Sequence, residues 1–511
     1  MRKNKSWFAL TTLVLACVLV ISGCSKEKEK TDEKKDVAQE IKVRIHDDPD
    51  FLDPHLATAS ISFQMILNIF EGLLAPETDG TLKEAVAESY EVSDDGLVYT
   101  FKIREGIKFQ DGNAVTVEDV RYTFERLMGT NNNEPLSSNF DKVKTIDAPD
   151  EKTFVITLEE PNSNFLYSLT ALQSAIIPQS NDGKHNDHPI GTGPFKFVSY
   201  SPNAEMVLEK NKEYWNEGLP HLDKLTFAFQ TDDQSAFMAL QGNEIDITSI
   251  PAHRIPEVEN DFNINKQQNN SALVVTFNHE KEPFNNLKVR QAINYAINKE
   301  DIINSVYSGF ATELGSNMSP AMGEYYLDGL QDKYKRDITK AKELLKEAGY
   351  PDGFKTKISV SSHNSMYSDV AQVTAENLKE IGIDVEIEVV EWGIWLDRIY
   401  RGRDYEMTTI DLTGRPSAYE VLNDYISNND SENFFRFNNA EFDTVMEDVL
   451  KESDQDKQVK LYQRAQEILA EEVGAVYVAD YQFIWAVNKR LEGQKFYPFW
   501  FHDMSEMRVI Q

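Results

Sequence analysis

The pattern of apolar and polar residues divides the chain into segments with strand-like and helix-like periodicity. Residues alternate with a period of two at Ile41–Ile45, which is typical of a strand with one buried face. The same alternation recurs at Tyr99–Ile103, Phe154–Leu158 and Val385–Val389. Strands are therefore predicted in both halves of the chain.

Helical periodicity is strong in three other segments. Ser60–Leu74 places its large apolar residues on one face, and Val289–Ile297 carries apolar residues at i, i+3, i+4, i+7 and i+8. A further helix is predicted near Asp456–Glu472. Each of these segments would bury one apolar stripe against the rest of the protein.

One helix also carries both of its termination signals. In Asp337–Tyr350, Asp337 is a good N-cap, and Gly349 supplies a residue that accepts the left-handed conformation after the last turn. Pro351 then blocks continuation of the helix. Because strands and helices interleave along the whole chain, the predicted fold class is α/β.

The first residues differ from everything that follows. Met1–Lys5 is basic, and Ser6–Ser22 contains no charge but is shorter than the ~20 residues of a membrane-spanning helix. Such a segment is typical of a secretory signal, and Val20–Cys24 resembles a bacterial lipobox. Residues 1–23 are therefore predicted to be a lipoprotein signal peptide, with Cys24 as the acylated residue. The alternative is an ordinary signal peptide with incidental cysteines.

Residues 24–40 are nearly all charged or small, so they have little to bury and are predicted to be a disordered tether. Together with Cys24, this predicts a protein on the extracellular face of the cell membrane, held there by lipid alone.

Composition narrows the function further. The chain has 511 residues, 41% of them hydrophobic, which is enough for packed cores. Its formal net charge of −33 argues against nucleic acid as a partner, since both would be anionic. The two cysteines, Cys17 and Cys24, provide neither a disulfide framework nor a metal cluster.

Sequence motifs of enzymes are absent. The chain has no nucleotide-binding glycine loop, no His-Glu-x-x-His and no Gly-x-Ser-x-Gly, so no catalytic residue, cofactor or metal is predicted. His185 and His188 are a close pair that would suit a metal, but they stand in a turn-rich stretch, for which a solvated loop is the better interpretation.

A series of short motifs resembles the bacterial extracellular solute-binding proteins of the peptide/nickel family. The segment Gly191–Phe195, with two glycines and a proline before an aromatic strand, resembles the family's Gly-Thr-Gly-Pro-Tyr signature. The other matching segments, in the family's order, are Leu52–Pro54, Phe70–Leu73, Phe109–Gly112, Thr116–Phe124, Asn211–Trp215, Gly242–Asp246, Phe277–Asn278, Pro283–Phe284, Val289–Ala292, Leu344–Pro351 and Phe442–Asp443. The matches span residues 41–500.

This resemblance implies a two-lobed periplasmic-binding-protein fold with mixed sheets, an enlarged first lobe and a hinge. The first lobe would span residues 41–271, with an extra subdomain at about 85–188. The second lobe would span 272–482, and a tail, 483–511, would return to the first lobe. The implied function is the substrate-binding component of an ABC importer, a monomer that captures oligopeptides and delivers them to the permease subunits.

The same resemblance suggests ligand-binding residues. Trp392 matches a tryptophan that lines the cleft in peptide-binding relatives, with packing in the second lobe as the alternative, and Trp395 is predicted to be core. Those relatives carry Trp-x-x-Asp before a proline-containing turn, and this aspartate binds the peptide's α-ammonium. Here the stretch contains Asp411, Thr413, Gly414 and Arg415 before Pro416, and neither alignment restores the pattern.

Asp411 would then bind the ammonium group from a neighbouring position, and Arg415 would bind a carboxylate, with surface roles as the alternative for both. The departure leaves other cargoes open, namely a nickel or metal chelate, or an oligosaccharide. An anchored hydrolase and a non-transporting sensor are the alternatives from other functional classes.

Overall fold

The computed structural model describes residues 37–130, 134–498 and 502–510. The chain divides into two compact units, Met1–Val37 and Ala38–Gln511, and the description below concerns the second. The predicted signal peptide, Cys24 and nearly all of the predicted tether lie outside the described residues. No helix within the described ranges has the length and apolar character needed to cross a membrane.

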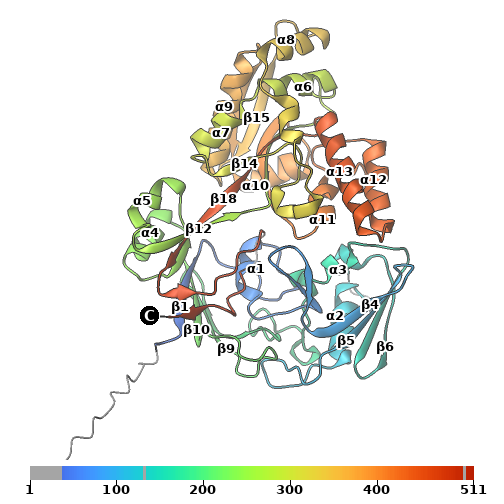
Figure 1. Ribbon diagram of the computed structural model, residues 1–511, viewed down its shortest axis with the longest axis vertical. Helices are drawn as coiled ribbons and strands as arrows, with labels where there is room; N and C mark the ends of the chain where they lie inside the picture. Colours follow the sequence, from blue (N-terminus) through green and yellow to red (C-terminus); the bar gives the residue numbers. More distant parts are fainter. Residues whose placement is uncertain (1–36, 131–133, 499–501, 511) are drawn as a thin grey trace, which may run out of the picture. The chain divides into compact units, whose positions relative to one another are not determined.

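The strands and helices of this unit alternate along the chain (Figure 1). The strands are β1 (Glu40–Ile45), β2 (Leu74–Pro76), β3 (Leu82–Glu84), β4 (Ala87–Val92), β5 (Val98–Ile103), β6 (Val143–Asp150), β7 (Thr153–Leu158), β8 (Phe195–Ser201), β9 (Glu205–Lys210), β10 (Lys224–Phe229), β11 (Ile247–Ser249), β12 (Phe262–Gln268), β13 (Ala272–Phe277), β14 (Ala311–Glu313), β15 (Lys355–Ser361), β16 (Asp384–Val390), β17 (Met407–Leu412), β18 (Val476–Asn488), β19 (Leu491–Glu492) and β20 (Arg508–Val509).

The helices are α1 (Ser60–Ile66), α2 (Val117–Leu127), α3 (Phe165–Ser168), α4 (Asp233–Gln241), α5 (Ile255–Val258), α6 (Leu287–Ala296), α7 (Lys299–Val306), α8 (Ile338–Glu347), α9 (Ser365–Lys379), α10 (Trp392–Ile394), α11 (Ala418–Leu422), α12 (Ala440–Lys451) and α13 (Gln455–Glu471). A π-helical turn, Trp395–Arg401, continues α10. The predicted α/β class is confirmed.

The largest sheet is mixed and has twelve strands. Its order is β16-β15-β17-β13-β18-β11-β1-β10-β9-β8, and β12 and β14 also pair with β18. β1 is parallel to β10 and β11, and β15 is parallel to β16 and β17, whereas β18 is antiparallel to its partners. A separate antiparallel sheet, β4-β5-β7-β6, lies within the predicted subdomain at 85–188. The predicted lobe boundaries themselves stay predictions.

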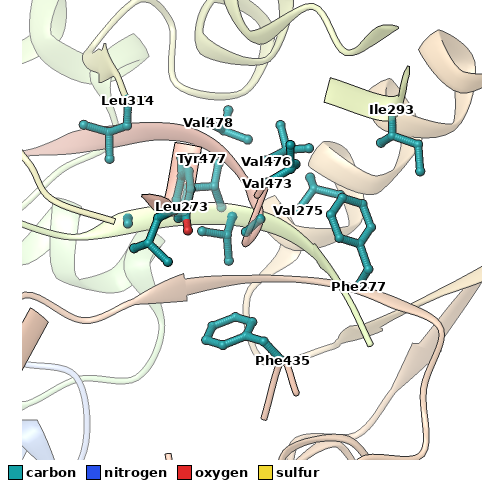
Figure 2. Close-up of a cluster of buried hydrophobic side chains, with 14 of the residues drawn as sticks. Leu273, Val275, Phe277, Ile293, Leu314, Phe435, Val473, Val476, Tyr477 and Val478 are labelled. Atoms are coloured by element: carbon teal, nitrogen blue, oxygen red, sulfur yellow. The ribbon is translucent and has the colours of Figure 1, made fainter. Parts of the chain in front are cut away.

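Buried apolar side chains form separate clusters. One cluster takes all its buried members from Ala272–Ala479 and surrounds β13 and β18. Figure 2 shows part of it, with Leu273 and Val275 of β13 beside Val476 of β18 and with Ile293 of α6 on one side. The buried members of the remaining clusters come from residues 41–262 and from Ile484 onward. The first part of strand β18, Val476–Ala479, thus belongs to the cluster around β13, and its last part, Ile484–Val487, belongs to the other clusters.

Most predicted elements are confirmed within one to three residues. The four predicted strands correspond to β1, β5, β7 and β16, and three predicted helices correspond to α6, α8 and α13. The Asp337 side chain caps α8 by accepting a hydrogen bond from the Lys340 N–H, and Gly349 has φ 94°.

The predicted helix Ser60–Leu74 is wrong in length, because α1 ends at Ile66. After that residue, the carbonyl oxygens of Asn68 and Ile69 accept hydrogen bonds from Phe195 and Gly193 instead of from the next helical turn. A long-range contact therefore replaces the helix that the local pattern favours.

Candidate ligand-binding site

A cavity of about 1000 Å³ is lined by segments that are distant in sequence. Its walls come from residues between Thr58 and Leu219, from residues between Thr413 and Glu432, and from Lys495, Asp503, Ser505 and Glu506. This volume is at the upper end of the ~300–1,000 Å³ of drug-sized ligand sites, so it is large enough for a short peptide. We call the Thr58–Leu219 and 495–506 residues the first wall and the Thr413–Glu432 residues the second wall.

The carboxylate of Glu71 is the central polar group of the first wall. It accepts hydrogen bonds from Thr192 Oγ1 at 2.8 Å, Tyr214 Oη at 2.7 Å and Trp215 Nε1 at 2.9 Å. Burial raises the pKa of Glu71, and these three donors lower it in part. All three are neutral, so the carboxylate is held in place without a compensating positive charge.

Two glycines bring these residues together. A Cβ atom on Gly191 would lie 2.2 Å from the carbonyl oxygen of Ile69, and one on Gly193 would lie 2.7 Å from the same oxygen. Only glycine permits this approach, in which the Gly193 N–H donates to Ile69 O at 2.9 Å. The Gly191–Phe195 motif therefore places Thr192 beside Glu71.

The second wall contains three of the predicted ligand-binding residues. Thr413, Gly414 and Arg415 follow β17 and line the cavity. A Cβ atom on Gly414 would lie 2.5 Å from the carbonyl oxygens of both Asn269 and Asn270, so this backbone is packed directly on the segment that precedes β13. Asn270 Nδ2 also donates to Arg415 O at 2.9 Å.

Arg415 is neutralised by its own neighbours. Its Nη2 lies 3.3 Å from Asp424 Oδ1 and 3.4 Å from Glu432 Oε2, and the Asp424 carboxylate is the main cause of its raised pKa. Burial raises the pKa of Asp424 to about 6 and also raises that of Glu420, which lines the cavity. Contact between Arg415 and a ligand carboxylate stays a prediction, and it would have to compete with these ion pairs.

Asp411 does not line the cavity. It lies near the end of β17, and its Oδ1 is buried without a hydrogen-bond partner among the described residues. Burial raises the pKa of Asp411 to about 7, with a further increase from Asp480, while the hydroxyls of Ser271 and Tyr481 act in the opposite direction. The carboxyl group is therefore partly protonated near neutral pH, and a role as ammonium anchor stays a prediction.

Trp392 also lies outside the cavity wall. Its side chain is 36% exposed, stacks on Trp395 with ring centroids 5.3 Å apart, and contacts His363. Trp395 is buried, as predicted, and its Nε1 donates to Thr408 Oγ1 at 3.1 Å. Contact of Trp392 with a ligand stays a prediction.

The interpretation of His185 as part of a solvated loop is wrong. Its side chain is fully buried beside Phe70, and the Asn181 amide lies 3.2 Å from its Nδ1, whereas His188 is exposed. Burial lowers the pKa of His185 to about 4, so the ring is neutral at physiological pH. The described residues contain no group of three or more histidine, cysteine, aspartate or glutamate side chains arranged to hold a metal ion.

Several cavity residues were not predicted to be ligand-binding residues. Glu71, Tyr214 and Trp215 belong to the family-like motifs Phe70–Leu73 and Asn211–Trp215, whereas Glu420 and Asp503 belong to no such motif. The local pattern gives no sign that residues 71, 192 and 215 meet. The one available signal is that each of these residues lies in a different motif of the same family pattern and has a side chain that can donate or accept a hydrogen bond.

Comparisons with known proteins agree with this architecture. The family model for bacterial extracellular solute-binding proteins, family 5 (middle) matches residues 81–433. The glutathione-binding protein GsiB of Shigella flexneri is 29% identical over 472 residues, covering 89% of this chain and 92% of GsiB.

Two solved structures are similar over the whole fold. The periplasmic binding protein DppA of Helicobacter pylori, in complex with the peptide STSA, has a TM-score of 0.79 and 28% identity and covers 92% of this chain and 98% of its own. The substrate-binding protein CtaP of Listeria monocytogenes has a TM-score of 0.83 and 26% identity and covers 93% and 100%. The predicted two-lobed binding-protein fold is confirmed. The chain belongs to the bacterial extracellular solute-binding proteins, family 5, and is a solute-binding protein rather than an enzyme.

Proposed function

We propose that this protein is the lipid-anchored substrate-binding component of an ABC importer, which captures oligopeptides outside the cell and delivers them to the permease. The observation that carries this proposal is the cavity of about 1000 Å³ between the first and second walls. A peptide in such a cavity satisfies its backbone through hydrogen bonds to the protein, with water filling the remaining space.

Two of the relatives support peptides as the cargo. DppA is described in complex with a tetrapeptide, and GsiB is named for glutathione, which is itself a tripeptide derivative. A metal chelate or an oligosaccharide has no comparable support from the wall residues. Closure of two lobes around the ligand is the motion expected for such a site.

A contact away from β18 supports closure. The Ser163 N–H donates to Leu450 O at 2.9 Å, and Ser163 Oγ donates to Val449 O at 2.9 Å, which joins the segment before α3 to the end of α12. Ser417 Oγ, just before α11, is hydrogen-bonded to the side chain of Asn164. These hydrogen bonds would form as the lobes close and break as the lobes open.

The test of peptide binding has two parts. Mass spectrometry of ligand released from the purified protein should identify peptides, and calorimetric titration with a mixed peptide library should show saturable binding. A protein that carries and binds sugars or metal chelates, but no peptide in either measurement, would contradict the proposal.

The lipid anchor is tested separately. Growth with a tagged fatty acid should label the protein, and Cys24→Ala should abolish the label and release the protein from the membrane. A labelled Cys24→Ala variant would contradict anchoring at this residue. Because both walls come from one chain, we also propose a monomer, which light scattering of the purified protein checks.

A further inference from the structure

The cavity wall contains more acidic side chains than basic ones. The three basic side chains that line the cavity are each paired with a carboxylate that also lines it. Lys83 Nζ lies 2.9 Å from Glu77, Lys495 Nζ lies 2.8 Å from Glu506, and Arg415 Nη2 lies 3.4 Å from Glu432. These pairs cancel, so the bases leave no positive charge free for a ligand.

Four lining carboxylates remain. Glu71, Glu84, Glu420 and Asp503 form no ion pair among the residues that the structure describes. Glu71 and Asp503 belong to the first wall and Glu420 to the second. Carboxyl groups without an ion-pair partner are therefore present on both sides of the cavity, and a cation beside Glu71 or Glu420 would offset the burial that raises the pKa of each.

Arg104 does not neutralise this charge. Its guanidinium lies over the Trp215 ring, 4.1 Å from the centroid, and donates to the carbonyl oxygens of Ala85 and Ala87. Trp215 in turn donates to Glu71. The arrangement fixes the aromatic side chains of the wall but leaves the carboxylate without an ion-pair partner.

We infer that the cavity selects peptides that carry lysine or arginine side chains over neutral and anionic peptides of the same length, an inference that rests on the proposed function. A carboxylate with restricted solvation is stabilised by a cation held nearby. A cationic side chain between the two walls would lie near a carboxylate of each wall. An anionic peptide meets repulsion from both walls and finds every lining base already paired.

A second interpretation of Glu71 is purely structural, since it also orients Tyr214 and Trp215. The variants that test the inference are therefore Glu420→Gln and Asp503→Asn, which remove charge but keep size. Within the described residues, neither Glu420 nor Asp503 is hydrogen-bonded to Tyr214 or Trp215, and the Asp503 carboxylate accepts the neighbouring Ser505 N–H at 2.8 Å. Glu259→Gln, at an exposed acid outside the cavity wall, is the matched control.

The experiment measures Kd by calorimetry for alanine tripeptides and pentapeptides whose central residue is lysine, glutamine or glutamate, and for glutathione. We expect the lysine peptide to bind at least about tenfold more tightly than the glutamine peptide, and the glutamate peptide and glutathione to bind more weakly still. High salt should reduce the difference. Glu420→Gln and Asp503→Asn should each reduce the lysine-to-glutamine ratio, while Glu259→Gln should not.

The outcomes separate the two proposals. Equal Kd values for lysine, glutamine and glutamate peptides would overturn the charge selection and leave peptide binding intact. Failure of every peptide to bind would overturn the proposed function itself. If the lysine preference survives in both cavity variants, which thermal unfolding must show to be folded, these carboxylates are not its source and the inference is overturned.

Discussion

The two walls of the cavity both contain buried carboxylates, but different interactions stabilise the carboxylates in each wall. In the first wall, Glu71 is held by three neutral donors and has no base beside it. In the second wall, Arg415 lies between Asp424 and Glu432, so these two acids are stabilised mainly by the positive charge of the arginine. The first wall depends on hydrogen-bond geometry and the second on charge balance.

This difference predicts different responses to mutation. Removing a donor in the first wall leaves one carboxylate less well solvated. Removing the base in the second wall leaves several carboxylates facing one another without compensation. The second wall should therefore be the more sensitive to loss of a single side chain.

Replacing Arg415 should have the largest effect. Arg415→Met should lower the free energy of unfolding by about 3 kcal/mol, a value at the low end for breaking a buried pair because the arginine is about one-third exposed. Urea unfolding at neutral pH measures it. Arg401→Met, which removes an exposed arginine paired with Asp397, is the control and should change stability by less than about 1 kcal/mol. Equal losses in both variants would remove the distinction between the walls.

Tyr214→Phe tests the first wall. It removes one hydrogen bond to the Glu71 carboxylate and should cost about 2 kcal/mol, because bonds to charged groups are stronger than neutral ones. The same urea titration measures it. Tyr90→Phe is the matched control, since the Tyr90 hydroxyl makes no hydrogen bond within the described residues. A loss larger than that of Arg415→Met would reverse the comparison.

Gly414→Ala probes the backbone of the second wall. The added Cβ would lie 2.5 Å from two carbonyl oxygens, which are backbone atoms that cannot rotate away, so we expect a loss of about 1.5 kcal/mol and weaker ligand binding. At Gly393 the nearest atom to an added Cβ is the flexible end of Glu391, at 3.0 Å. Gly393→Ala should therefore be nearly neutral, and thermal unfolding of the two variants compares them.

Asp411→Asn should have the smallest effect, visible as a change with pH. The pKa of Asp411 is about 7 in the folded protein against 3.8 for an ordinary aspartate, so the folded state favours the protonated carboxyl group. The contribution of this group to the free energy of unfolding is therefore present at low pH and is lost as pH rises through about 7. Between pH 5 and pH 8 the wild type should lose about 1 kcal/mol relative to the variant, after allowance for partial exposure.

Buried histidines such as His185 titrate in both proteins, so they cancel in this difference. Unfolding curves of the two proteins across this pH range provide the measurement. Parallel stability profiles would show that Asp411 ionises normally.

The fold was more predictable from sequence than the site. Periodicity located β1, β5, β16 and α8 closely, because those elements bury a regular apolar face or carry a cap. It failed at Ser60–Leu74, where hydrogen bonds from Gly193 and Phe195 end the helix early. That competition involves residues more than a hundred positions apart, which no local pattern contains.

The site shows the same limit. The stretch Thr413–Arg415 was predicted because it lies where the Trp-x-x-Asp pattern of peptide-binding relatives is expected and is not matched. This stretch lines the cavity. The partners that neutralise Arg415 follow it within twenty residues but give no periodic signal. Glu71 and Asp503 come from opposite ends of the chain, so only the folded structure brings their charges into one cavity.

Strand β18 has a consequence for the order of folding. It occupies an interior position in the large sheet, between β13 and β11, yet it begins only at Val476. A nascent chain that ends before this residue has exposed edges on both of those strands and cannot complete the sheet. The two halves of the large sheet are therefore joined only when this late segment has been synthesised, and pairings of such high sequence separation form slowly. Truncation within β18 should therefore prevent folding of both lobes and not merely of the last one.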